Sequence, residues 1–332
     1  MRPTRTLPSR ILGCVAVVGA GLIALTGCGL QPATAFVPQV APGSIQPLDL
    51  PPGAAVTITS KNFTEQLILG KIAVIAAKAA GFDVTDMTNV PGSSPVRQLM
   101  LTGVADMTWE YTGTAWLTYL AQTVGIPDPT LQYEAVRNAD KANGLTWLPT
   151  APLNNTYAMA VRTEAVAGLN GITKMSQLAA LPPSDLTFCV EAEFNSRPDG
   201  MTPMLAAYGL DRGTAVPESN INIFDTGAVY TATDRGTCNF GEVFTTDGRI
   251  DSLGLTVLED DLGFFPAYNV AAVVNTATLA KYPGLARVFA QISPMITEET
   301  LRGLNLRVDE GGEEPANVAF GFMLQAGFIT AP

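Results

Sequence analysis

The sequence predicts an α/β protein with two lobes, each built on a sheet whose strands alternate with helices. Three observations support this. From Val56 to Trp116 the apolar pattern changes from strand to helix three times. Further strand-like runs follow between residues 157 and 274, again separated by helical segments. The chain of 332 residues, with 47% hydrophobic residues, is also long enough for two cores.

The first strand and helix come directly after a charge-poor N-terminal region. Val56–Thr59 is a short β-branched run that predicts a strand. Asn62 is expected to cap the following helix, with Glu65 three residues later, and Gly81 is expected to end it.

A second and a third helix are expected on either side of the strand at residues 104–109. Ser94 and Pro95 suit the start of the second helix, and Gly103 its end. The polar turn at residues 110–114 leads into the third. Parallel sheets bind ligands where the carboxyl ends of strands meet helix N-termini, so residues 60–62 and 111–114 are expected near a site.

The rest of the chain continues this pattern and returns to the first lobe at its end. We predict a first lobe from residues 54–158 and 266–332, with a second lobe at 159–265 inserted between them. Two crossings, near 158–161 and 263–266, permit a hinge, and the cleft between the lobes is the expected ligand site. Further strands are expected at 157–161, 186–190, 221–224, 243–245, 255–258 and 270–274, and further helices at 132–141, 201–208, 279–292, 298–305 and 316–326.

The N-terminal residues have the features of a secretory signal. Residues 1–27 contain three arginines and no acid, and their apolar run from Ile11 to Leu25 is short for a membrane span. The run ends at Leu-Thr-Gly-Cys28, which looks like the bacterial lipobox, in which the cysteine is diacylated. The alternative is an ordinary signal peptide followed by a chance cysteine. Two acyl chains would anchor the exported protein to the outer face of the cytoplasmic membrane.

Residues 28–53 are rich in proline and nearly free of charge, which predicts an extended tether between lipid and folded protein. Without residues 1–27 the chain keeps 16 of its 19 basic residues and all 30 acidic ones, a net charge of −14. A nucleic-acid partner is therefore not expected. Cys189 and Cys238 are the two cysteines left for an exported domain, and they form either one disulfide or a pair of buried thiols.

The sequence argues against an enzyme. It contains no histidine, which excludes Ser-His-Asp and Cys-His nucleophile systems and most zinc sites. It has no GxGxxG after a strand and no GxxxxGK[ST], so nucleotide binding has no support. We expect no metal and no cofactor. An enzyme built on this two-lobed fold and a cell-envelope adhesin or scaffold remain as alternatives.

Six short segments occur in an order and spacing that we recognise. They are SKNFTEQ from residue 60, EYTGT from 110, NNTYA from 154, NSRPDG from 195, FTTDGRI from 244 and FFPAYN from 264. Together with LNLRVD near the C-terminus they resemble the osmoprotectant-binding lipoproteins of ABC transporters. That family binds glycine betaine, choline, carnitine and related quaternary amines. The resemblance implies a two-lobed type II periplasmic-binding fold, with an ABC permease and its ATPase as partners.

The resemblance also implies the residues of a binding site. Family members hold a trimethylammonium group in an aromatic box, and a lysine, a threonine and an arginine hold the ligand's carboxylate. The matching positions here are Lys61, Tyr111, Thr114, Tyr157, Arg197 and Tyr268, and Phe244 stands where the family usually has tyrosine.

The chemistry of a quaternary ammonium explains why such a set would work. The group has no N–H to donate, so the faces of electron-rich rings attract it instead. An arginine can bind a carboxylate in bidentate fashion, while a lysine adds a point charge. The phenylalanine at 244 keeps a ring face but lacks the hydroxyl, so selectivity among such ligands stays open. An isolated tyrosine is otherwise a packing residue, and Trp109 and Trp116 are expected to be core residues.

Overall fold

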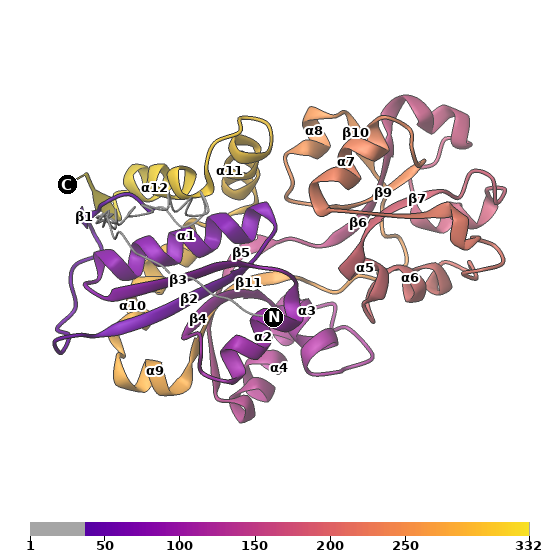
Figure 1. The fold of residues 1–332 in the computed structure, drawn as a ribbon. Helices are drawn as coiled ribbons and strands as arrows, with labels where there is room; N and C mark the ends of the chain where they lie inside the picture. Colours follow the sequence, from indigo (N-terminus) through magenta and orange to yellow (C-terminus); the bar gives the residue numbers. More distant parts are fainter. Residues whose placement is uncertain (1–36, 332) are drawn as a thin grey trace, which may run out of the picture. The chain divides into compact units, whose positions relative to one another are not determined.

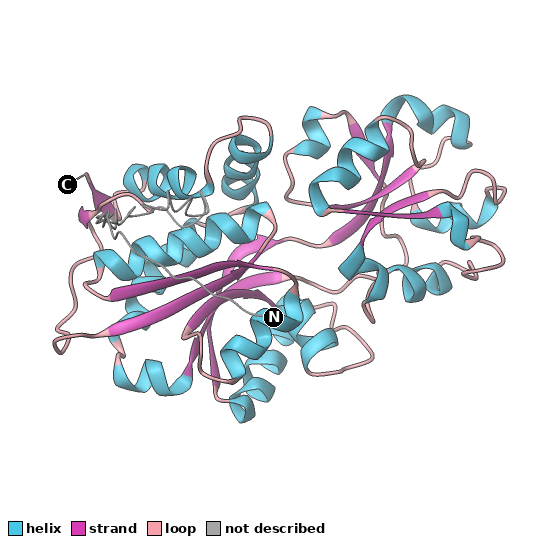
Figure 2. Ribbon diagram, in the orientation of Figure 1, coloured by secondary structure: helices cyan, strands magenta, loops and turns pink. Residues whose placement is uncertain are grey.

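The structure, a computed structural model, describes residues 37–331, and these fall within one compact unit. The expected signal at residues 1–27 and the expected lipidation at Cys28 lie outside the described residues. Among the helices of residues 37–331, none combines the length and the apolar character needed to cross a bilayer. Two five-stranded sheets form the framework of this part of the chain (Figure 2).

The first sheet is mixed, where the alternation of strands and helices predicted a parallel one. Strand β2 pairs in parallel with β3 and β4, whereas β11 is antiparallel to both β4 and β5. β11 runs the opposite way because the chain enters it on returning from the second sheet. In spatial order the strands are β3 (Asp83–Val90), β2 (Ala55–Lys61), β4 (Met107–Tyr111), β11 (Asn269–Asn275) and β5 (Leu145–Asn154).

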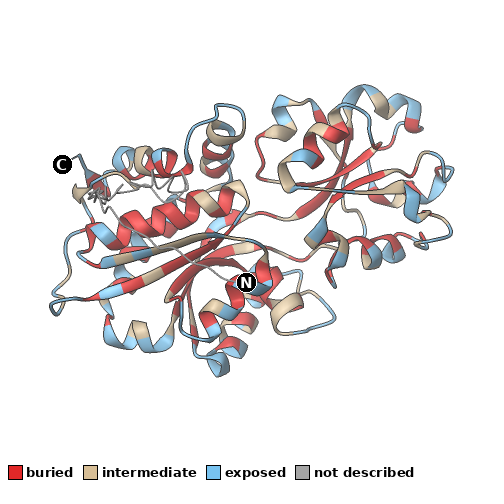
Figure 3. Cartoon of the chain, in the orientation of Figure 1, coloured by how far each residue is buried: buried red, intermediate tan, exposed pale blue. Residues whose placement is uncertain are grey.

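Helices cover both faces of this sheet, so a hydrophobic core lies on each face. Alternate residues of β11 belong to the two cores. Val270, Ala272 and Val274 belong to the large core cluster, while Ala271 and Val273 belong to a smaller one. On the first face lie α1 (Thr64–Ala79), α10 (Gly284–Ile292), α11 (Glu298–Asp309) and α12 (Pro315–Gln325); on the second lie α2 (Ser93–Leu101) and α4 (Pro129–Asp140) (Figure 1). α1 is buried along most of its length because it lies between the sheet and the other three helices (Figure 3).

The second sheet combines parallel and antiparallel pairs in the same way. β7 is parallel to β8 and β9, and β6 is antiparallel to β9 and β10. Cys189 in β7 and Cys238, just before β9, form a disulfide. The strands in spatial order are β10 (Leu255–Val257), β6 (Tyr157–Arg162), β9 (Phe240–Phe244), β7 (Phe188–Glu191) and β8 (Ile221–Phe224), with helices α5 (Ala192–Ser196), α6 (Met201–Ala207), α7 (Thr226–Asp234) and α8 (Arg249–Ser252).

We call the chain around the first sheet the first lobe and the chain around the second sheet the second lobe. The first crossing lies at residues 155–156, between β5 and β6, and so before the expected 158–161. Tyr157 and Ala158, which the sequence places in the first lobe, pair with β9 of the second sheet. The return crossing lies between β10 and β11 and includes residues 263–266.

The second half of the predicted tether is wrong. Ala41–Pro42 (β1) pairs with Ile329–Thr330 (β12), and the amides of Ser44 and Ile45 donate to the carbonyls of Gly327 and Phe328. Ile45 is fully buried in the large core cluster. Proline-rich composition had suggested an extended chain, but the apolar residues between the prolines supply enough contact to dock it on the first lobe.

Two local predictions also differ from the structure. Asn62 does not cap α1, since Phe63 occupies that position and the Asn62 side chain accepts from the Gly92 amide. The third helix is short, an α-helical turn at Thr112–Thr114 (α3) followed by a π-helix at Ala115–Tyr119.

Candidate functional site

The topology of the two sheets brings the predicted residues to one pocket. Lys61 and Tyr111 are the last residues of β2 and β4, and Tyr157, the first residue of β6, is paired with Phe244, the last of β9. The cavity that these residues surround is small, with a volume of about 40 Å³. It is lined by all seven predicted site residues: Lys61, Tyr111, Thr114, Tyr157, Arg197, Phe244 and Tyr268.

The aromatic side chains of the pocket form one connected group around Tyr157. Its ring centroid lies 5.3 Å from that of Phe244 and 5.6 Å, edge-on, from that of Tyr268. Tyr111 joins through Phe63, whose ring lies 6.1 Å from Tyr111 and 5.0 Å from Phe244. We did not predict Phe63, although it lies inside the SKNFTEQ segment.

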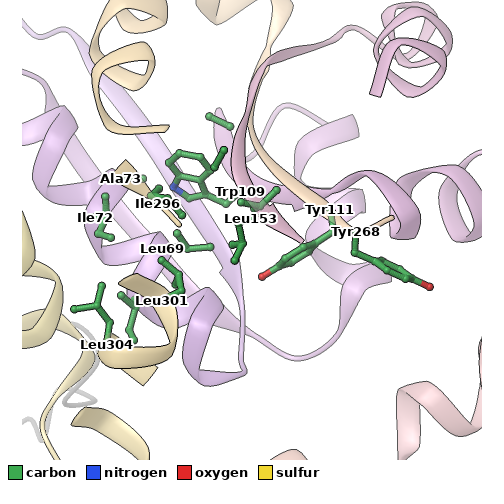
Figure 4. Close-up of a cluster of buried hydrophobic side chains, with 14 of the residues drawn as sticks. Leu69, Ile72, Ala73, Trp109, Tyr111, Leu153, Tyr268, Ile296, Leu301 and Leu304 are labelled. Atoms are coloured by element: carbon green, nitrogen blue, oxygen red, sulfur yellow. The ribbon is translucent and has the colours of Figure 1, made fainter. Parts of the chain in front are cut away.

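Tyr111 and Tyr268 also mark where the first lobe's core meets the pocket. Figure 4 shows both rings at one end of a buried cluster, with Trp109 and the aliphatic side chains on the other side. Trp109 is fully buried, which agrees with its expected role in the core. The Tyr268 hydroxyl donates to Asp199 Oδ2 at 2.5 Å, so this ring is oriented by a second-lobe residue.

Both cations of the expected carboxylate clamp already have acidic partners. Lys61 Nζ lies 2.6 Å from Glu110 Oε1. Arg197 donates from Nε and Nη2 to the two oxygens of Asp199, at 2.7 and 2.6 Å. Asp199 therefore occupies the edge of the guanidinium that carries Nε and Nη2. The edge between Nη1 and Nη2 faces other groups.

The remaining edge of Arg197 contacts both lobes. Its Nη2 donates to Thr114 Oγ1 at 3.4 Å, and its Nη1 donates to Glu193 Oε1 at 3.1 Å. Glu193 Oε2 in turn accepts from the backbone amide of Ser93, the first residue of α2, at 3.0 Å. Burial alone would raise the pKa of Glu193, but the charge of Lys61, the Ser93 hydrogen bond and Arg197 together lower it. No local pattern could have predicted Glu193, because its partner amide is 100 residues away.

A second residue that sequence reasoning misplaced is Glu65, the expected capping acid. Its side chain is buried and accepts from the Tyr111 hydroxyl at 2.7 Å and from Asn155 Nδ2 at 3.0 Å. Its other oxygen accepts from Thr246 Oγ1, a second-lobe residue, at 2.6 Å. Burial raises the pKa of Glu65. Glu65 thus orients Tyr111 and links the two lobes.

The arrangement offers ring faces, two cations and several carboxylates, and it suits a small ligand that carries positive charge on an apolar surface. In the part of the chain that the structure describes, no three His, Cys, Asp or Glu side chains gather as a metal site would require.

Comparison with known proteins points in one direction. The family described as "Substrate binding domain of ABC-type glycine betaine transport system" matches residues 54–325. A glycine-betaine-binding protein of Pseudomonas aeruginosa is 36% identical over 274 residues, covering 80% of this chain and 86% of that protein. An ergothioneine transport permease/ergothioneine binding protein of Helicobacter pylori is 28% identical over 82% of this chain and 48% of its own length.

A solved structure described as a glycine betaine/carnitine/choline ABC transporter is similar in fold. It superposes with a TM-score of 0.66 at 26% identity, over 82% of this chain and 99% of its own. The two sheets with their two chain crossings are thus those of a type II periplasmic-binding-protein fold, with the ligand cleft between the lobes.

Proposed function

Because this chain belongs to the family of substrate-binding domains of ABC-type glycine betaine transport systems, we propose that it captures a quaternary-amine osmoprotectant for import. Glycine betaine is the ligand we propose first, with choline, carnitine and proline betaine as further candidates. The bound ligand would pass to an ABC permease driven by its ATPase, without chemical change.

The observation that carries this proposal is the connected group of rings around Tyr157. A trimethylammonium group cannot donate a hydrogen bond, so ring faces are its best partners in a protein. Each such contact contributes about 0.5–2 kcal/mol, and more when water is excluded. Tyr111, Tyr157 and Tyr268 are 4%, 9% and 2% exposed, so their contacts with a ligand would be well shielded from water. Three or four rings together could support micromolar binding.

Arg197 and Lys61 would hold the ligand's carboxylate. Asp199 fixes the guanidinium in place by its two hydrogen bonds, and the edge that carries Nη1 remains available to a competing anion. Thr114 contributes a hydroxyl from the opposite lobe. A betaine would thus contact both lobes, and its binding would favour their closure.

We also propose that the protein acts at the membrane. Lipidation at Cys28 would place it on the outer face of the cytoplasmic membrane, close to the permease. Mass measurement of the exported protein tests this, because a diacylated Cys28 adds the mass of two acyl chains and a glyceryl group. An unmodified N-terminus would refute it.

A receptor for a different small solute is the main alternative, since one relative is named for ergothioneine. Isothermal titration calorimetry with glycine betaine is the direct test. A heat of binding that fits a dissociation constant in the micromolar range would support the proposal. If glycine betaine, choline, carnitine and proline betaine all fail to bind, the proposed ligand class is wrong, and a non-transport envelope role comes back into consideration.

A further inference from the structure

Every cation that lines the pocket is already matched by carboxylates of the protein. Lys61 is paired with Glu110, whose side chain is only 4% exposed. Arg197 is paired with Asp199, whose side chain is 1% exposed. These two acids are buried and held by several hydrogen bonds, so neither is free to leave its cation when a ligand arrives.

Glu193 is different. It also pairs with Arg197, but by a single contact at 3.1 Å, and its side chain is 27% exposed. It lines the pocket as well as the larger and more open depression next to it, so it has room to turn away from the guanidinium. Of the acids that contact Arg197, it is the one that a ligand could displace.

The two contacts of Glu193 are those that a ligand's carboxylate would seek. One oxygen accepts from the Arg197 guanidinium, and the other accepts from the amide of Ser93 at the N-terminus of α2. A guanidinium edge and a helix N-terminus are both good partners for an anion. The carboxylate of a bound betaine and that of Glu193 would therefore compete for the same positive groups.

Building on the proposed function, we propose that Glu193 is a substitute carboxylate that determines which quaternary amines the site accepts. When the ligand has no carboxylate, as in choline, Glu193 stays on Arg197 and Ser93 and balances the charge of the ligand. When the ligand brings its own carboxylate, as in glycine betaine, Glu193 is displaced. A cation thus gains from the negative charge of Glu193, whereas a betaine must compete with it.

The substitution Glu193→Gln tests this directly. The glutamine oxygen can still accept from the Ser93 amide, so the link between the lobes is kept while the negative charge is lost. Calorimetry should show choline binding about tenfold more weakly, a modest effect because Glu193 is partly exposed to solvent. Glycine betaine should bind as tightly as before, or more tightly.

Glu310→Gln is the matched control. Glu310 Oε1 accepts from the Ser252 hydroxyl of the second lobe at 2.9 Å, and neither residue lines the pocket. This variant removes a carboxylate from a contact between the lobes at a distance from the ligand, and both affinities should stay unchanged.

The possible outcomes separate the alternatives. A selective loss of choline binding supports the proposal. If Glu193→Gln weakens both ligands equally, Glu193 serves only to hold the lobes together, and the proposal is overturned. Unchanged affinities for both ligands overturn it as well. If the wild-type protein binds neither ligand, the proposed function itself fails. This outcome is distinct from a failure of the role of Glu193, which shows only in how the variant changes the two affinities relative to the wild type.

Discussion

Replacing Tyr157 is the sharpest test of the aromatic site, because its ring lies at the centre of the group. Besides Phe244 and Tyr268 it contacts Phe194, at 4.9 Å between centroids, and the Arg197 guanidinium lies 5.2 Å from its ring. Its hydroxyl makes no hydrogen bond to residues 37–331, so the ring alone is expected to matter. The pair Tyr157→Ala and Tyr157→Phe separates the ring from the hydroxyl.

The expected magnitudes follow from these contacts. Loss of one shielded cation–ring contact of about 1.4–2 kcal/mol corresponds to at least a tenfold weaker affinity for Tyr157→Ala. Tyr157→Phe should bind glycine betaine with the wild-type affinity within about twofold, because a phenyl ring keeps the face that attracts the cation. Calorimetry at 25 °C measures both.

Stability must be followed in parallel, since truncating a large buried ring costs about 3–5 kcal/mol of the free energy of unfolding. Phe188→Ala provides the comparison. Phe188 is fully buried against Phe240 in the second lobe and does not line the pocket, so this variant should lose stability and keep its affinity. An unchanged affinity in folded Tyr157→Ala would refute the aromatic site. An equal loss in Tyr157→Phe would show that the hydroxyl, not the ring, makes the contact.

Three further predictions concern charge, pH and the N-terminal segment. Arg197→Ala should weaken glycine betaine at least tenfold more than choline in calorimetry, because only the betaine has a carboxylate to lose a partner; equal losses would contradict the clamp. Burial, together with neighbouring Glu191, raises the pKa of Glu242 from 4.5 to about 8, so the folded state holds this proton more tightly than the unfolded chain. Stability should therefore fall as pH rises from 4.5 to 8, by up to roughly 1.4 kcal/mol per pH unit, and Glu242→Gln should flatten this slope in urea titrations; an identical slope would argue against it. Ile45→Ala should cost about 2–5 kcal/mol in urea unfolding because Ile45 is fully buried, and a negligible cost would restore the tether interpretation for this segment.

Features with a local signature could be predicted from the sequence. The alternation of strands and helices follows from the spacing of apolar residues, and Gly81 and Gly103 end their helices with the positive φ angles, 95° and 71°, that glycine tolerates. The segments that carry Lys61 and Tyr111 were expected at one edge of the sheet because a strand meets a helix or polar turn at each, and both residues line the pocket.

Predictions failed where a local sequence pattern is compatible with more than one structure. A glutamate three residues after an asparagine suits a capping pair, but Glu65 turns into the interior because Tyr111, Asn155 and Thr246 satisfy it there. The proline-rich stretch before residue 53 has the composition of a free linker, yet Ile45 is fully buried in the large core cluster, which composition cannot reveal.

By itself, the sequence determined the α/β fold class and the order of the elements, because each depends on residues close together along the chain. Only the tertiary structure decided the direction of β11, the position of the crossing before Tyr157 and the pairing of Glu193 with Ser93 and Arg197. The physical reason is that hydrogen bonds and ion pairs between distant residues depend on where the backbone carries them, and nothing in the neighbouring sequence records the partner.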